Sequence, residues 1–169
     1  MGEKAAEIRD AVTADLDAIF TIYNHEVLHG VSTFDTETRD PEADVDWLAS
    51  RARRYPVLVA ERDGVVLGWG SLSQWSPRRA YARTAEVSVY VDRSHRGEGI
   101  GRALLNALIE RAPLGEIAVL LARIAGENPA SIALHESLGF SHIGVQRRSG
   151  EKLGRVLDVA LMDLHLDEG

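Results

Sequence analysis

Three glycines at alternate positions lie near the middle of the chain, in the segment 93-RSHRGEGIGRALL-105. Gly97, Gly99 and Gly101 stand between Arg96 and Arg102, and an apolar run follows. The first N–H groups of a helix lack intrahelical partners, and the helix dipole adds positive charge there. Glycine lets the backbone approach a ligand closely, and arginine adds charge-assisted donors. The segment therefore indicates an anion site suited to phosphate, against the alternative of a glycine-rich turn with solvated arginines.

The composition excludes several other classes of protein. A net charge of −7 over 169 residues argues against a nucleic-acid binder. The apolar stretches are too short to cross a membrane, and the chain contains no cysteine for disulfides or thiolate chemistry. No metal-ligand spacing such as H-E-x-x-H occurs, and neither a Walker lysine nor a dinucleotide motif fits the glycine segment. We expect one cytoplasmic domain over residues 1–169 that binds no metal.

The elements that must position the glycine segment alternate between strands and helices. Apolar periodicity and turn residues predict strands at 7–10, 57–62, 65–72, 84–92, 116–123, 140–147 and 156–166. Capping residues predict helices from Thr13 or Asp15 to 28, and over 40–54, 99–112 and 129–139. The strand–loop–helix–strand order across the glycine segment implies a parallel crossover, and hairpins make the other pairs antiparallel. The predicted fold is α/β, with a mixed, mostly antiparallel sheet of about seven strands and about four helices.

Residues 96–101 resemble the [Q/R]-x-x-G-x-[G/A] acetyl-CoA signature of the GNAT N-acetyltransferase superfamily. They follow strand 86-EVSVYV-91, as in that family, and 128-NPASIALHESLGF-140 is similar to its second coenzyme-contacting helix. Further segments resemble the branch of phosphinothricin and methionine sulfoximine N-acetyltransferases, namely 33-TF-34, 55-YPVLVAE-61, 80-AY-81 and 153-LGRVLDVALMDL-164. The resemblance runs from about residue 8 to 166. It implies the GNAT fold, whose sheet is splayed at the coenzyme site, and a homodimer.

The resemblance also implies that acetyl-CoA is the co-substrate and indicates which residues hold it. The pyrophosphate would lie on the glycine loop, and the pantetheine arm would pair with the backbone of the preceding strand. Asn128 would contact the arm or its phosphates, with a plain helix N-cap as the alternative role. The residues assigned to the coenzyme are Val89, Tyr90, Val91, Arg96, Gly97, Glu98, Gly99, Ile100, Gly101, Arg102, Asn128 and Ser131.

Acetyl transfer needs a neutral amine, donors for the oxyanion and a proton for the departing thiolate. Glu86 is the candidate base, because it begins the strand that leads into the glycine loop and the resembled branch has a glutamate there. The alternative is an exposed glutamate at a strand end. His135 shares a helix face with Asn128 and Ser131. It could act as acid for the thiolate or as base for the amine, against a purely structural role.

The segment 74-QWSPRRAYAR-83 is rich in arginine and aromatic residues and precedes the candidate base. Arg78, with Arg83 as an alternate, could clamp a substrate carboxylate, or these arginines could be solvated. The remaining residues assigned to the substrate pocket are Phe34, Tyr81, Ser88 and, along its wall, Tyr90.

Two residues depart from the resembled branch. Ser76 stands where phosphinothricin-acetylating members often carry a lysine, which favours methionine sulfoximine or methionine sulfone, whose heads are polar but uncharged. Arg123 replaces a residue that is usually apolar, and the sequence offers no explanation for it.

The predicted function is transfer of an acetyl group from acetyl-CoA to the α-amine of a small amino-acid-like substrate. One alternative is a peptide N-terminus or a polyamine, since an acidic protein attracts cations. Arg78, Arg79 and Arg83 make the substrate segment unfavourable for such a cation. The other alternative is a non-catalytic module that binds acetyl-CoA and regulates a partner, against which the presence of Glu86 and His135 argues.

Overall fold

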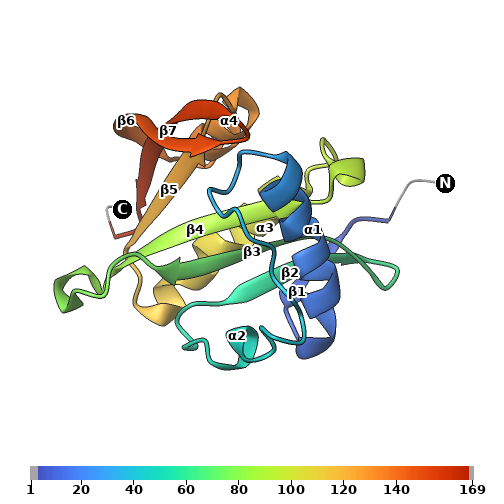
Figure 1. Ribbon diagram of the computed structural model, residues 1–169. Helices are drawn as coiled ribbons and strands as arrows, with labels where there is room; N and C mark the ends of the chain where they lie inside the picture. The colour runs from blue at the N-terminus through green and yellow to red at the C-terminus, as the bar shows by residue number, and fades with distance from the viewer. Residues whose placement is uncertain (1–3, 168–169) are drawn as a thin grey trace.

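The computed structural model describes residues 4–167, so the predicted domain of residues 1–169 extends beyond the described part at both ends. A seven-stranded sheet in the order β1-β2-β3-β4-β5-β7-β6 lies between helices on its two faces (Figure 1). The strands are β1 (Glu7–Asp10), β2 (Val57–Arg62), β3 (Val65–Gln74), β4 (Thr84–Val91), β5 (Val119–Ala125), β6 (Ser141–Lys152) and β7 (Arg155–His165). The helices are α1 (Leu16–His29), α2 (Asp46–Ala49), α3 (Ile100–Arg111) and α4 (Pro129–Ser137). The predicted mixed α/β fold is confirmed.

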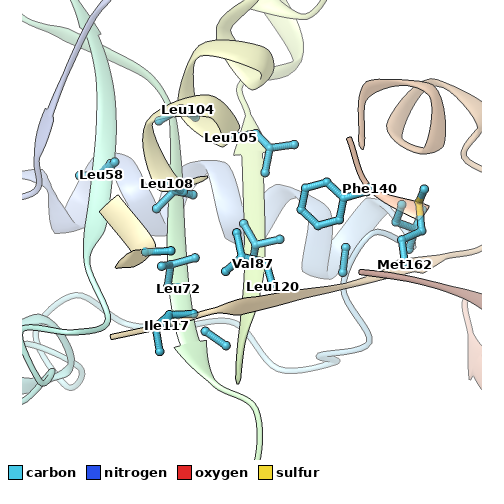
Figure 2. Close-up of a cluster of buried hydrophobic side chains, with 14 of the residues drawn as sticks. Leu58, Leu72, Val87, Leu104, Leu105, Leu108, Ile117, Leu120, Phe140 and Met162 are labelled. Carbon is cyan, nitrogen blue, oxygen red and sulfur yellow. The ribbon is translucent and has the colours of Figure 1, made fainter. Parts of the chain in front are cut away.

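The two faces of the sheet have separate apolar cores because side chains alternate along each strand. Leu58 of β2 lies in the core beneath α3, whereas Val57 and Val59 lie in the core beneath α1. Figure 2 shows Leu104 and Leu108 of α3 above the sheet, and both side chains are fully buried. The helix that follows the glycine loop is therefore fixed to the sheet along its whole length.

Strands β4 and β5 are parallel neighbours that separate partway along their length. Strand β4 pairs with β3 as far as Val91, which lies opposite Gly68. Its pairing with β5 ends at Glu86, which lies opposite Leu121. Residues 87–91 therefore leave one backbone edge without a β5 partner, and the sheet opens there (Figure 1). The predicted parallel crossover through α3 is confirmed.

The predicted helix over residues 40–54 is wrong. Only α2 (Asp46–Ala49) is helical there, and it is preceded by turns. The Asp40 carboxylate accepts a hydrogen bond from the Glu42 backbone N–H (2.9 Å), and the Asp44 carboxylate accepts from Arg39 (2.9 Å). Acidic side chains that bond nearby backbone groups compete with helical hydrogen bonds, and the segment therefore forms turns.

The boundaries of three strands also differ from the predicted ones. Strand β5 begins at Val119, because residues 112–115 form a 3-10 turn and Glu116 adopts a left-handed backbone (φ 60°). Strands β6 and β7 extend through the predicted turn-rich segment 149–155. Their turn is only Leu153-Gly154, both at positive φ, which suits a two-residue hairpin. Among residues 4–167, no helix is long and apolar enough to cross a membrane.

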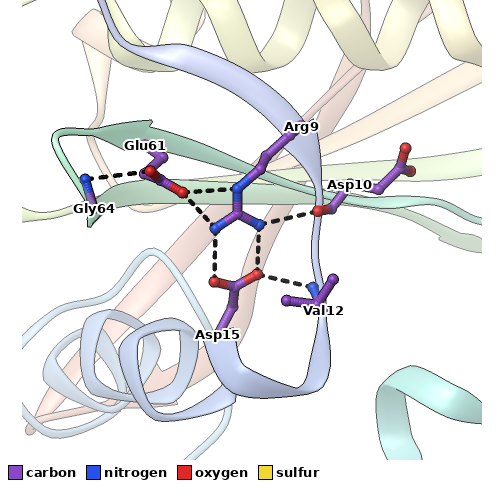
Figure 3. Close-up of polar contacts among 6 residues, drawn as sticks. All are labelled: Arg9, Asp10, Val12, Asp15, Glu61 and Gly64. Atoms are coloured by element: carbon purple, nitrogen blue, oxygen red, sulfur yellow. Dashed lines mark hydrogen bonds and ion pairs between the residues drawn. The ribbon is translucent and has the colours of Figure 1, made fainter.

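An ion-pair network joins β1, β2 and the start of α1 (Figure 3). The Arg9 guanidinium donates to both carboxylate oxygens of Asp15 (2.7 and 2.9 Å) and to Glu61 (2.8 Å). Asp15 also accepts from the Val12 backbone N–H (2.8 Å) and is buried. These hydrogen bonds, first among them those from Arg9, lower the pKa of Asp15.

We expect Asp15→Asn to lower the free energy of unfolding by about 2 kcal/mol, because it weakens charge-assisted bonds in a buried position. A lowered carboxyl pKa stabilises the fold above the unfolded-state pKa of about 3.9, and this contribution disappears as pH falls through the lower folded-state pKa. Urea unfolding at pH 7 and at successively lower pH measures both effects. Asp63→Asn is the control, since Asp63 and Lys4 form an exposed pair at 3.6 Å. A deficit in Asp15→Asn that stays constant to the acid limit would contradict this account.

Candidate active site

The glycine loop ends at the N-terminus of α3. Gly97 and Gly99 both have φ of +83°, and Gly99 is the residue immediately before the helix. A side chain at either position would meet no atom within 4 Å, so the loop backbone is open to a ligand on that side. With the unpaired N–H groups of the first helical turn, this loop fits a phosphate-bearing group.

The charged residues of the loop have partners within the protein. Arg96 bonds Glu26 of α1 (2.5 Å), and Arg102 donates to the hydroxyl of Ser137 at the end of α4 (2.7 Å). Glu98 accepts a hydrogen bond from Arg62 of β2 (2.9 Å), and this bond lowers the pKa of the Glu98 carboxyl. These contacts hold the loop between α1, α4 and the sheet and leave its backbone as the ligand-facing surface.

A cavity of about 90 Å³ lies in the opening between β4 and β5. Its walls bring together residues predicted for the coenzyme, for the substrate and for catalysis, and the predicted members are Ser88, Val89, Tyr90, Asn128, Ser131 and His135. The Asn128 side-chain oxygen accepts from the Ser131 backbone N–H (3.1 Å), so this residue does cap α4. The free β4 edge beside this cavity fits an extended arm that can pair with backbone groups.

His135 enters the same opening from α4. Its Nδ1 lies 2.8 Å from the backbone oxygen of Ser131, so Nδ1 carries the proton and Nε2 has the free lone pair. The ring packs edge-on against Phe140 at a centroid distance of 5.0 Å. Burial lowers the pKa of His135 below the ordinary value. The imidazole is therefore a neutral group that can accept a proton at Nε2 near neutral pH.

A second cavity, of about 450 Å³, adjoins the first along β4, because Ser32, Ser88, Tyr90, Arg123 and Ala125 line both. The rest of its lining is Tyr23, Thr33, Phe34, Asp35, Glu86, Gln146, Ser149 and Val159. The two cavities therefore lie next to each other along β4, the first at the strand opening and the second at the candidate base. A larger hollow of about 980 Å³, between residues 10–11, 48–57 and 111–116, contains none of the predicted site residues.

Glu86 lies at the last position of β4 that pairs with β5, where the sheet begins to open. Its carboxylate accepts two hydrogen bonds from Arg123 of β5, from Nε (3.1 Å) and from Nη2 (2.6 Å). The Glu86 side chain is 19% exposed and that of Arg123 is 51% exposed. The guanidinium also lies 5.4 Å from the ring of Trp75. A paired carboxylate in a half-open cavity can exchange its partner for a charged ligand.

The residues predicted for the substrate divide into two groups. Phe34 and Ser88 line the larger of the two adjoining cavities. Arg78 and Tyr81 lie in the connection between β3 and β4, which projects away from the sheet (Figure 1), and neither residue lines either cavity. Arg83 pairs with Asp167 (2.5 Å). Within one chain, therefore, the structure does not bring these three residues to Glu86.

Sequence reasoning missed Tyr23, Asp35 and the role of Arg123. The Tyr23 hydroxyl bonds Asp35 and the Thr33 hydroxyl (3.0 Å) at the wall of the cavity. Burial, aided by Asp35, raises the pKa of Tyr23 to about 12. In the sequence Tyr23 is indistinguishable from a core residue of an amphipathic helix. Arg123 did carry a signal, because it interrupts the apolar strand VLLARIA.

An open sheet beside a helix N-terminus, with a carboxylate and a neutral histidine at the opening, is typical of a group-transfer enzyme with a phosphate-bearing donor. The model of the acetyltransferase (GNAT) family matches residues 16–140. The L-methionine sulfoximine/L-methionine sulfone acetyltransferase of Salmonella typhimurium is 43% identical over 162 residues, 95% of each chain. The phosphinothricin N-acetyltransferase of Alcaligenes faecalis is 38% identical over 170 residues, 98% of this chain and 85% of that protein. A solved Salmonella typhimurium structure with its cofactor acetyl-CoA has a TM-score of 0.93 at 42% identity, covering 98% of this chain and 96% of that one.

The chain belongs to the GNAT acetyltransferase family. The predicted family, class of enzyme and acetyl-CoA co-substrate are thereby confirmed. Among residues 4–167, no group of three or more His, Asp or Glu side chains is arranged to hold a metal ion.

The conformation of Gly99 leads to a prediction about the loop. We expect Gly99→Ala to raise the KM for acetyl-CoA about tenfold, because the left-handed backbone is strained for alanine by about 1–2 kcal/mol and the new methyl group projects into the ligand side. Initial rates at varied acetyl-CoA measure the effect. Gly64→Ala is a matched control, since Gly64 has φ of +82° and equally open surroundings in the β2–β3 turn. Equal KM values in the two variants would contradict the assignment of the loop.

Proposed function

We propose that this enzyme transfers the acetyl group of acetyl-CoA to the α-amine of a small amino-acid-like substrate of the methionine sulfoximine, methionine sulfone or phosphinothricin type. The observation that carries the proposal is the pair of adjoining cavities along β4, one at the strand opening and one at Glu86. A cavity of about 450 Å³ suits an amino-acid-sized acceptor. The names of the similar proteins from Salmonella typhimurium and Alcaligenes faecalis support the same class of acceptor.

The coenzyme is proposed to lie along the glycine loop and the free edge of β4. Residues 96–102 would hold its pyrophosphate, and the backbone groups of residues 89–91 would pair with its pantetheine arm. Asn128 and Ser131 would flank the arm from α4, since both line the strand opening. Bound there, acetyl-CoA supplies an activated acetyl thioester.

Glu86 and His135 are proposed to manage the protons of the reaction. The acceptor nitrogen forms a bond to the acetyl carbon while the carbon–sulfur bond breaks, and the nitrogen must lose a proton. Glu86 is the proposed acceptor of that proton, because its carboxylate lies on the wall of the acceptor cavity. An acceptor that arrives as an ammonium has a second proton to lose, and His135 is proposed to take it up at Nε2, where the lone pair is free because Nδ1 is bonded to Ser131. It then passes this proton to the departing thiolate.

The acceptor side chain is proposed to lie against Phe34, Ser88 and Tyr90, which line the cavity. Ser76, in place of a lysine, favours the sulfoximine and sulfone over the anionic phosphinothricin. We further propose a cytoplasmic homodimer in which Arg78, Tyr81 and Arg83 contribute to substrate binding. Exposed apolar side chains on the edge strand β6, Ile143 (53%) and Val145 (57%), are consistent with a contact between copies, and light scattering measures the mass of the particle.

Thiol release from acetyl-CoA across a panel of amines tests the function. The panel holds L-methionine sulfoximine, L-methionine sulfone, L-phosphinothricin, plain L-amino acids, a polyamine and a short peptide. The proposal predicts turnover centred on the first two, with weaker turnover of phosphinothricin. Turnover of only the peptide or polyamine would overturn the acceptor assignment. Coenzyme binding without turnover of any amine would instead favour a regulatory module.

A further inference from the structure

We propose that Arg123 is a specificity-determining residue that binds the α-carboxylate of the acceptor, and that the Glu86–Arg123 pair is a docking site for an amino-acid zwitterion. On binding, the acceptor's ammonium group takes the place of Arg123 beside Glu86, and its carboxylate takes the place of Glu86 beside Arg123. The inference rests on the proposed function, because it names the group of the acceptor that the enzyme recognises.

The backbone fixes the two charges next to each other. Glu86 is paired across the β4–β5 ladder with Leu121, and Arg123 lies two residues further along β5 on the same face of the strand. The resulting pair is bidentate, with contacts of 3.1 and 2.6 Å. Bidentate geometry is what a guanidinium also offers to a free carboxylate. The Arg123 guanidinium therefore already binds one carboxylate in this geometry, and in the structure that carboxylate belongs to Glu86.

The guanidinium remains accessible to a ligand. The Arg123 side chain is 51% exposed, whereas its partner Glu86 is 19% exposed. Within residues 4–167, only Nε and Nη2 of this guanidinium make hydrogen bonds, both to Glu86, so Nη1 is available. The contact with Trp75 at 5.4 Å orients the guanidinium plane without using its donors. Arg123 lines both adjoining cavities, so a carboxylate bound to it would keep the amine close to the strand opening.

The charges of the residues that line the larger of the two adjoining cavities also favour Arg123 as the group that binds the carboxylate. Among its lining residues Arg123 is the one cation, whereas Asp35 and Glu86 are acidic. The nearby Lys152 is buried and donates to the backbone oxygens of Glu26 (3.1 Å) and Thr33 (2.7 Å), outside the lining. Without Arg123, an entering carboxylate would meet only negative charge. An acceptor with an ammonium group and a carboxylate instead matches both members of the pair.

A pair of substrates that differ only at the carboxylate tests the inference. The probes are L-methionine sulfone and its α-carboxamide, each assayed with wild type, Arg123→Gln, Arg78→Gln and the surface control Arg155→Gln. Glutamine keeps a hydrogen-bond donor for Glu86 but removes the charge. We expect Arg123→Gln to lower kcat/KM for the acid about 10- to 100-fold, mainly through KM, and for the amide less than about threefold. The acid and the amide differ in amine basicity, but this difference is the same for every enzyme variant. It therefore cancels when the acid-to-amide ratio of kcat/KM in a variant is compared with that of the wild type.

Three results would overturn the inference. Equal losses for acid and amide in Arg123→Gln, with acetyl-CoA binding retained to show a folded protein, would mean that Arg123 only positions Glu86. A collapse of the acid-to-amide ratio in Arg78→Gln but not in Arg123→Gln would assign the carboxylate to the β3–β4 connection. A wild-type enzyme that acetylates neither probe would overturn the proposed function and this inference together, an outcome distinct from the other two.

Discussion

Glu86→Gln is expected to lower kcat by about 100- to 1000-fold at neutral pH, the range that a general base contributes. Glutamine keeps the shape of the side chain and an oxygen for Arg123, so the cavity and the KM for acetyl-CoA should change little. The deficit should shrink as pH rises past the pKa of the free amine, since the acceptor then arrives deprotonated. Initial rates of thiol release from pH 6 to pH 10 measure both effects.

Glu7→Gln is the matched control for this experiment, because Glu7 is an exposed glutamate at the sheet edge on β1. It should behave as the wild-type enzyme does. A Glu86→Gln enzyme with undiminished kcat at neutral pH would exclude Glu86 as the base. A deficit that stays constant at high pH would indicate that Glu86 positions the acceptor without taking its proton.

His135→Asn is expected to lower kcat by about 100-fold and to remove one limb of the pH–rate profile. Asparagine can still donate to the Ser131 backbone oxygen in place of Nδ1, but it has no group at the position of Nε2. Burial lowers the pKa of His135, so the neutral form persists below the ordinary value of about 6.5. The wild-type profile should therefore fall at a pH below about 6.5, as the ring becomes protonated, and the variant should lack that fall.

The same lowered pKa has a consequence for stability. The unfolded chain takes up the proton before the folded one does, so the folded state is fully favoured above about pH 6.5 and loses this contribution as pH falls toward the folded-state pKa. Urea unfolding of wild type and His135→Asn between pH 5 and pH 8 measures the difference. His142→Asn, at an exposed His142–Glu136 pair (2.8 Å), controls for loss of a surface histidine. If the pH dependence of kcat is unchanged in His135→Asn, His135 has only a structural role.

The fold could be predicted where local signals agree with tertiary packing. The hairpin at Asp63-Gly64 and the helix after Gly99 have turn chemistry and apolar periodicity that indicate the same element. The segment 40–54 has a helical pattern with Pro41 near its start, yet its acidic side chains bond to the local backbone and to Arg39. Whether a helix or a series of turns is more stable in this segment also depends on its contacts with α1, which cannot be read from the sequence.

The candidate site was predictable along the main chain but less so across the sheet. The glycine loop, Glu86 and His135 stand at fixed offsets from strand and helix ends, so their positions follow from local pattern. Arg123 acquires its partner only because β4 and β5 are parallel neighbours in a particular register. Arg78 has the right chemistry for a carboxylate, but it does not line the cavity of its own chain. Which side chains reach the cavity therefore depends on how segments distant in the sequence pair with each other. The spacing of residues in the sequence does not reveal that pairing.

The most direct test of the account is to follow the acetyl group itself. Carbon-13-labelled acetyl-CoA is incubated with the enzyme and L-methionine sulfone, and the product is examined by NMR. The account predicts one labelled amide carbonyl on the α-nitrogen, formed in equal amount to the released thiol. Thiol release without a labelled amino-acid amide would mean that the thioester is hydrolysed, and it would contradict acetyl transfer to the α-amine.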